Sequence, residues 1–134
     1  MTARYLLDTH IVVRWLSTPQ KLSREQRRVL GEAVRHREPV ALSAMTLLEI
    51  AVLFGQGAKR NDMQAEDILD QIASNPIFEI VPLTVEIASE VAALGPSLRD
   101  PGDRAIVATA RVHRLILLTS DERIIESKLV PTVS

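Results

Sequence analysis

Short apolar runs that alternate with longer amphipathic segments constrain the fold of this chain more than any other feature. The strand-like runs are residues 4–8, 40–42, 78–82, 115–119 and 129–133. The segments with helical periodicity are residues 9–17, 23–36, 44–55, 62–74, 84–94, 103–113 and 121–127. Strands that alternate with helices predict an α/β fold, in which a mainly parallel, twisted sheet is flanked by helices on both faces.

The size and composition of the chain predict a single domain over residues 1–134. Its 134 residues, 46% of them apolar, are enough for one substantial core, and no linker or internal repeat divides them. No apolar run approaches the roughly 18 residues that a membrane span requires. The start lacks the apolar stretch of a signal peptide, and we therefore expect a cytoplasmic protein without membrane association.

The charges are unevenly distributed along the chain. The net charge is −1, but residues 1–40 carry eight Lys and Arg against four acids, whereas residues 41–134 carry eight against thirteen. A balance near zero argues against a protein that holds nucleic acid by charge alone. It is compatible with one basic face beside an acidic pocket.

Four carboxylates interrupt or end segments that otherwise have the composition of a core. Asp8 ends the first strand-like run, Asp121 follows the run 115–119, Asp103 opens a helical run, and Glu49 lies inside the apolar stretch 45–53. A buried carboxylate is costly unless a donor, a cation or a metal compensates it. In open parallel sheets, ligands bind outside the carboxyl ends of the strands, where we expect these acids to meet.

Each acid also has a simpler explanation when it is considered alone. Asp8, Asp103 and Asp121 are all suited to cap a helix or to occupy its first turn, where a negative charge is favourable. Glu49 could be a solvated or ion-paired residue, although its helical neighbours are apolar. Taken together, the acids indicate a divalent-metal site, and hard oxygen ligands without cysteine or a histidine cluster favour Mg²⁺, or Mn²⁺, over zinc.

The order of these motifs resembles that of the PIN domain, and more narrowly the VapC-type toxins of bacterial toxin–antitoxin pairs. The segments that carry the resemblance are residues 6–10, 42–49, 100–110 and 118–121. The resemblance implies a parallel sheet flanked by helices, an acidic pocket that binds Mg²⁺ or Mn²⁺, ribonuclease activity on RNA, and neutralisation by a cognate VapB-like or other small DNA-binding antitoxin. It also implies a homodimer.

The resemblance assigns roles to individual residues. The family's acidic quartet, catalytic and metal-binding, corresponds to Asp8, Glu49, Asp103 and Asp121. Asp100 is an additional acid that could be a ligand or a loop cap. The small polar residues expected to orient the acids are Thr9, Thr119 and Ser120, and Arg104 is expected to contact phosphate or a partner. Gly102, where many relatives have a larger residue, is a local departure.

We therefore expect a metal-dependent endoribonuclease toxin that cleaves RNA phosphodiester bonds by means of a metal-activated water. The alternative is a catalytically silent PIN-like module whose acidic pocket receives a basic segment of a partner. The partner is expected to dock near the first helix, which carries more apolar side chains than one helix face needs to bury: Ile11, Val12, Trp15 and Leu16.

Overall fold

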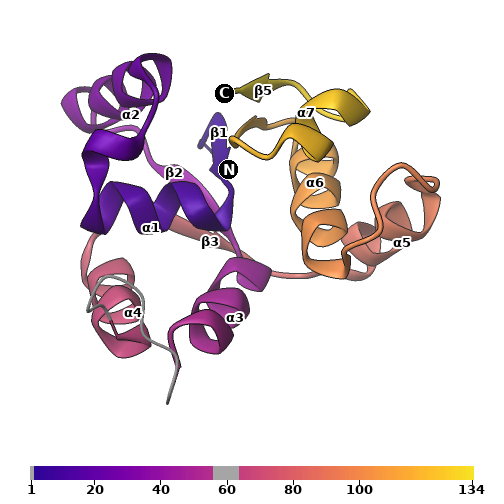
Figure 1. Ribbon diagram of the computed structural model, residues 1–134, viewed down its shortest axis with the longest axis horizontal. Coiled ribbons are helices and arrows are strands. Elements are labelled where there is room, and N and C mark those ends of the chain that lie inside the picture. The colour runs from indigo at the N-terminus through magenta and orange to yellow at the C-terminus, as the bar shows by residue number, and fades with distance from the viewer. Residues whose placement is uncertain (1, 56–63) are drawn as a thin grey trace.

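The computed structural model describes residues 2–55 and 64–134, which form five strands and seven α-helices in the predicted alternation (Figure 1). The strands are β1 (Tyr5–Leu7), β2 (Val40–Ser43), β3 (Phe78–Val81), β4 (Ile116–Leu118) and β5 (Thr132–Val133). The helices are α1 (Thr9–Ser17), α2 (Arg24–Arg35), α3 (Ala44–Leu53), α4 (Ala65–Ser74), α5 (Val85–Ala93), α6 (Pro101–His113) and α7 (Glu122–Ser127). A short 3-10 turn, Pro19–Lys21, follows α1.

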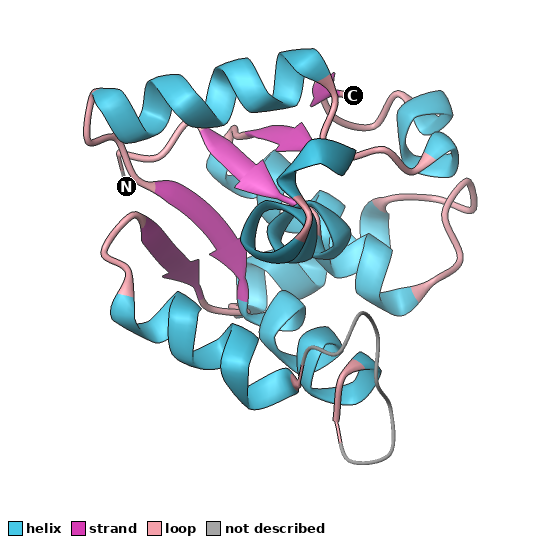
Figure 2. Cartoon of the chain, turned by 60° about the vertical axis from the view of Figure 1, so that its left-hand side comes forward, coloured by secondary structure: helices cyan, strands magenta, loops and turns pink. Residues whose placement is uncertain are grey.

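All five strands are parallel, in the order β3-β2-β1-β4-β5. The central strand β1 pairs with β2 through Leu6 and Ala41, and with β4 through Leu6 and Leu117. Figure 2 shows the twisted sheet with helices packed on both sides. The predicted α/β class is confirmed. The acids that follow β1 and β4 consequently leave the sheet at the same edge, next to each other.

Neighbouring residues of each strand face opposite sides of the sheet and fill two separate cores. Leu6 packs in one core with residues of α5, α6 and α7, whereas Leu7 packs in the other with residues of α1, α2, α3 and α4. The two groups of helices lie on opposite sides of the strands in Figure 1. The inner strands β1, β2 and β4 are largely buried on both faces, which explains why they appear in the sequence as continuous apolar runs.

Side-chain caps begin most of the helices, but not always the predicted ones. Ser23 and Gln26 form a capping box at α2, and Ser43 caps α3 through the Met45 amide. Asp8, and not Thr9 at the start of the predicted segment 9–17, caps α1, because the Asp8 side chain accepts a hydrogen bond from the Thr9 amide. The helix predicted from Asp103 begins at Pro101, since Asp100 is its cap.

Two other predicted boundaries differ. Helix α3 ends at Leu53 rather than at Gly55 or Gly57, and α4 begins at Ala65 rather than at Asp62. Gly57, the predicted turn over residues 58–61 and Asp62 lie outside the described residues. None of the helices in the described part of the chain has the length and hydropathy to cross a membrane.

Gln26 is a polar residue that is fully buried between α2 and the sheet. Its amide nitrogen donates to the carbonyl oxygens of Thr119, at 3.3 Å, and Val133, at 3.2 Å. Thr119 directly follows β4, and Val133 belongs to β5. A buried amide is stable at this position because its N–H groups are paired. Gln26 thus holds the segment after β4 in place, and Asp121 lies in that segment.

Candidate active site

The four predicted acids line one hollow of about 330 Å³ at the carboxyl edge of the sheet. Asp8 comes from the end of β1, Asp121 from the turn after β4, Glu49 from α3 and Asp103 from the first turn of α6. The structure therefore brings together carboxylates that are far apart in the sequence. Asp100, the fifth candidate, borders a neighbouring hollow instead and caps α6.

Asp8 is the most enclosed of these acids, with 4% of its surface exposed. Its Oδ1 accepts a hydrogen bond from the Thr9 amide at 2.8 Å, and its Oδ2 accepts one from the Thr119 hydroxyl at 2.7 Å. The Thr119 hydroxyl oxygen also accepts from the Asp121 amide at 3.0 Å. One threonine therefore orients the carboxylate of Asp8 and the backbone of Asp121 at once.

Glu49 is held by a chain of two threonine hydroxyls. Thr9 Oγ1 donates to Glu49 Oε1 at 2.5 Å and lies 3.1 Å from Thr46 Oγ1. Because a hydroxyl carries only one proton, Thr46 must be the donor to Thr9. Burial raises the pKa of Glu49, and the nearby charges of Asp8 and Asp100 raise it further, against the opposing effect of the Thr9 hydrogen bond.

Gly102 makes room for the Glu49 carboxylate at the start of α6. A Cβ atom at this position would overlap Glu49 Oε2 and would lie 3.1 Å from both Glu49 Cδ and Asp100 Oδ2. Gly102 has no unusual backbone angle that would itself require glycine. The departure from the family pattern therefore has a spatial reason, which is the close approach of Glu49 to α6.

For the ribonuclease activity that the resemblance implies, we expect Gly102→Ala to displace Glu49 and to lower RNA cleavage by about 10- to 100-fold, the range typical when a supporting residue of a metal site is disturbed. Cleavage of a labelled RNA measures the effect. Gly31→Ala is the matched control, because a Cβ atom at Gly31 meets nothing within 4 Å. Equal activity of the Gly102 variant and the wild type would show that Glu49 does not need this position.

Asp103 has the largest upward pKa shift in the site. Its pKa is raised to about 6, chiefly by burial and further by the charges of Asp100, Asp8 and Asp121, while Arg123 opposes the rise. A carboxyl group with such a pKa lacks the positive charge that would hold it ionised. The electrostatics of the hollow therefore favour a bound cation.

Asp121 differs from the other acids because it already has a cation. Arg123 donates to it through Nη2 at 3.0 Å and through Nε at 3.3 Å, and Arg123 Nη2 also lies 3.8 Å from Asp103 Oδ2. The Arg123 guanidinium lowers the pKa of Asp121. Asp121 also accepts from the Arg123 amide at the start of α7, so it is both a cap and a member of the acidic group.

The donor chemistry fits a divalent cation, although the described side chains do not form a ready-made ligand set. No three His, Asp or Glu residues among the described ones are grouped as metal ligands would be. Thr119, Thr9 and Arg123 each hold one of the acids. Like charges in one hollow repel, and a hard divalent ion with oxygen ligands removes that repulsion once the carboxylates turn toward it.

His10 is a member of the site that the sequence analysis did not identify. Its Nε2 accepts a hydrogen bond from the Ser120 amide at 2.9 Å, so a neutral ring carries its proton on Nδ1, which lies 3.5 Å from Asp8 Oδ2. Burial lowers the pKa of His10, although the charge of Asp8 opposes this. Its place directly after Asp8 on α1 was the only available signal.

The expectation that Arg104 contacts phosphate or a partner is not supported. Its guanidinium donates to the carbonyl oxygens of Val91, Gly95 and Leu98, at 2.6, 2.7 and 2.5 Å. Arg104 therefore fastens the segment after α5 to α6. Arg14 and Lys21 do line the acidic hollow, although the sequence analysis had not identified them.

Comparison with known proteins gives the family. A family model described as "PIN: PIN domain" matches residues 5–128. The chain belongs to the PIN-domain family. Among curated relatives, this PIN domain is 32% identical over 120 residues to "Ribonuclease VapC22" of Mycobacterium tuberculosis, covering 89% of this chain and 88% of the relative.

Solved structures also resemble this PIN domain. A "Toxin-antitoxin complex from Klebsiella pneumoniae" is 27% identical, with a TM-score of 0.65 and coverage of 97% of this chain and 96% of the other. VapBC2 from Rickettsia felis, bound to a DNA fragment from its promoter, is 17% identical with a TM-score of 0.72 over 96% of both chains. FitAcB from Neisseria gonorrhoeae is 21% identical, also with a TM-score of 0.72, over 97% and 96%. The last two similarities concern the fold alone.

Proposed function

We propose that this PIN-domain protein is a metal-dependent endoribonuclease and the toxin of a toxin–antitoxin pair. The observation that carries the proposal is the convergence of Asp8, Glu49, Asp103 and Asp121 on one hollow at the carboxyl edge of the sheet. The identity to a VapC ribonuclease supports the reaction class. The likeness to a toxin–antitoxin complex supports the biological role.

Asp8, Asp103 and Asp121 are the residues proposed to hold Mg²⁺ or Mn²⁺. A bound divalent ion would supply an activated water and would offset the charge that develops on the phosphate. Glu49, whose pKa is raised, is suited to accept a proton near neutral pH. Thr119, Thr9 and Thr46 keep the carboxylates of Asp8 and Glu49 in place before the substrate arrives.

Cleavage of labelled RNA by the purified protein tests this function against the catalytically silent alternative. The proposed enzyme cuts RNA internally with Mg²⁺ or Mn²⁺ and stops when EDTA is added. A silent binding module gives the same fragment pattern as buffer in every metal condition. Mass spectrometry of the ends of the fragments then identifies which phosphodiester oxygen is released.

We expect Mn²⁺ to stabilise the fold strongly at neutral pH. A ligand at a hundredfold excess over its dissociation constant contributes about 2.7 kcal/mol, which corresponds to a rise in Tm on the order of 10 °C for a chain of this size. Thermal melting with and without Mn²⁺ measures the rise. The double variant Glu49→Gln plus Asp103→Asn should melt higher than wild type without metal and gain little from Mn²⁺, because its hollow repels less and binds less.

The stabilisation by Mn²⁺ should also depend on pH. The pKa of Asp103 is raised from 3.8 to about 6, so its contribution to stability is fully present below 3.8 and is lost as the pH rises through about 6. Deprotonated Asp103 is the form that binds a cation. The Tm rise with Mn²⁺ should therefore be larger at about pH 7.5 than at about pH 5. An equal rise in Tm at the two pH values would show that Asp103 is not one of the residues that bind the metal.

The proposed partner is a small VapB-like antitoxin that covers the toxin and inhibits it. The hollow is acidic, and a partner arginine or lysine could enter it in place of a metal ion. The similarity to the complex from Klebsiella pneumoniae supports such a partner. A homodimer and a cytoplasmic location, which the sequence analysis also predicted, stay predictions.

A further inference from the structure

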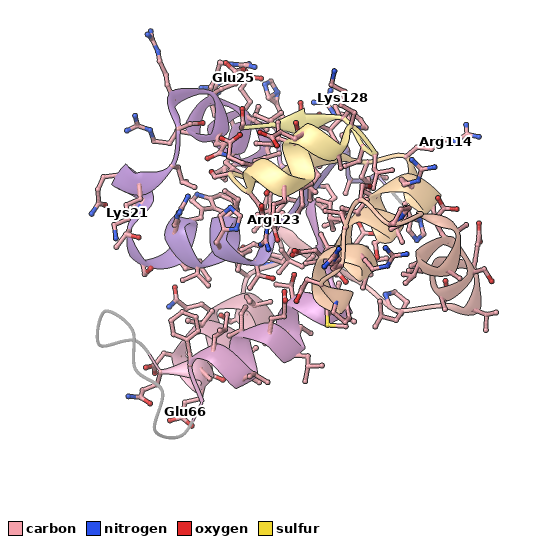
Figure 3. All side chains as sticks on the ribbon, turned by 45° about the vertical axis from the view of Figure 1, so that its right-hand side comes forward. Lys21, Glu25, Glu66, Arg114, Arg123 and Lys128 are labelled. Carbon is pink, nitrogen blue, oxygen red and sulfur yellow. The ribbon has the colours of Figure 1, made fainter. Side chains whose placement is uncertain are left out.

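Two hollows that contain arginines share Asp103, and one arginine of each hollow donates to a residue of the same turn. The turn is Ser120–Asp121, between β4 and α7. Arg14 lines the hollow that holds the acids, together with Lys21, whereas Arg123 lines a second hollow of about 190 Å³, together with Arg99 and Asp103. Arg123 lies between α1 and α6 in the view of Figure 3, and Lys21 lies near the far end of α1.

Arg14 is a half-buried cation in the acidic hollow that makes no direct ion pair with a described residue. Its one hydrogen bond in the described part of the chain goes from Nη1 to Ser120 Oγ at 3.3 Å, and it forms no ion pair there. A hydroxyl oxygen orients a guanidinium without cancelling its charge. Arg14 therefore presents most of its five N–H donors, and a full positive charge, to the hollow beside Asp8.

Arg123 is oriented by a carboxylate but remains accessible. Asp121 takes the donors of Nε and Nη2, and no contact among the described residues uses Nη1. The Arg123 side chain is 74% exposed. A planar guanidinium fixed along one edge keeps its other N–H groups for a second anion, and phosphate is the anion that matches this geometry best. Arg99 is exposed beside it and makes no ion pair with described residues.

An RNA backbone needs such cations on both sides of this site. The acidic group repels the phosphates next to the one being cleaved, and a net charge of −1 supplies no general attraction for RNA. A bound divalent ion would offset this repulsion only for the phosphate that is cleaved, and not for the phosphates next to it. Arg14 donates to Ser120 and Arg123 donates to the next residue, Asp121. The two arginines line different hollows, and Asp103 lines both of these hollows.

We propose that Arg14 and Arg123 bind the phosphates on either side of the cleaved one, so that a single RNA strand crosses the acidic centre along the Ser120–Asp121 turn. This inference rests on the proposed ribonuclease function and adds the path of the substrate to it. The arginines contact the backbone, so they position the strand without selecting its sequence.

The salt dependence of RNA binding tests this path. Binding of a short, unstructured, fluorescein-labelled RNA is measured by anisotropy over a range of salt concentrations in the Asp8→Asn background, which prevents cleavage. For single strands, each lost phosphate contact lowers the slope of log K against log salt by about 0.7. Arg14→Gln and Arg123→Gln should each show this decrease, and the double variant about 1.4.

Arg24→Gln is the matched control, because Arg24 is an exposed arginine at the start of α2 that lines neither hollow. It removes the same charge and should leave the slope unchanged. The same decrease in Arg24→Gln would indicate a general charge effect and overturn the path. Unchanged slopes in both Arg14→Gln and Arg123→Gln would also overturn it, and slower cleavage by Arg123→Gln would then reflect only the orientation of Asp121.

Cleavage by the otherwise unchanged protein separates this inference from the function on which it rests. If that protein cuts RNA while the slopes stay constant, the ribonuclease function holds and the path is wrong. If it neither cuts nor binds RNA, the proposed function itself fails. Equal melting temperatures of the Arg14, Arg123 and Arg24 variants establish that the slopes compare folded proteins.

Discussion

Asp8→Asn should lower RNA cleavage by more than about a hundredfold while the fold persists, since even partners behind a metal ligand contribute 10- to 100-fold. The amide keeps the volume of the carboxylate but loses the charge that attracts a cation. Its oxygen can still accept from the Thr9 amide, and its nitrogen can donate to the Thr119 hydroxyl oxygen, which can turn its own proton elsewhere. The hydrogen bonds at the end of β1 therefore survive in altered form.

Cleavage rates and thermal melts of both proteins measure this prediction. Asp67→Asn is the matched control, since it makes the same change at an exposed acid in the first turn of α4, outside the hollow. The control should cut RNA at the wild-type rate. An Asp8→Asn preparation that is free of contaminating nuclease and cuts equally fast would rule out Asp8 as a metal-binding residue.

The second large effect concerns the antitoxin. We expect the product of the small gene directly upstream, if one is present, to form a tight complex that does not cleave RNA. Ile11 and Val12, which we had expected on the docking surface, are fully buried in the core. The apolar hollow that remains near α1 has a volume of about 520 Å³ and is lined by Trp15, Val34, Pro39, Pro76 and Ile77, with Arg37 beside them.

Val34→Asp tests this surface better than Trp15→Asp. Trp15 packs against Phe78 with ring centroids 5.7 Å apart, so its loss would also disturb the core. Val34 is 54% exposed, and a charge there should weaken the complex by roughly 30-fold, the equivalent of about 2 kcal/mol at an interface hot spot. Titration calorimetry with the purified antitoxin measures the affinity.

Val85→Asp is the control for this experiment, because Val85 is exposed at the start of α5, on the other side of the sheet. This variant should bind like the wild type. The inhibitory-partner interpretation is wrong if the two unmodified proteins elute separately at micromolar concentration. It is equally wrong if their complex cuts RNA as fast as the toxin alone.

The architecture was predictable because it depends on local patterns. The inner strands β1, β2 and β4 are largely buried on both faces and so appear as short apolar runs, and Ser23, Ser43 and Thr84 cap helices as their positions suggest. The convergence of Asp8 and Asp121 followed from parallel strands ending at one edge. The position of Glu49 in an apolar helix likewise indicated that it faces the site.

The remaining features depend on contacts that no local pattern records. Thr46 looks like an ordinary helix residue until the fold places it against Thr9, 37 positions away. Arg104 and Arg123 are both near acids in the sequence, yet one guanidinium turns to backbone carbonyls and the other to Asp121. The direction of a long side chain is decided by which acceptors the folded chain offers within its reach.

The pairing of β1 with β4 affects when the nuclease can first act during its synthesis. The hydrogen bond from Thr119 to Asp8 joins residues 111 positions apart, and β4 lies beside the first strand at the centre of the sheet. A growing chain that still lacks β4 holds Asp8 and Glu49, but neither Thr119 nor Asp121. Contacts this distant in sequence form only after the intervening chain is available. The acidic group is thus incomplete until residues 119–121 have been made.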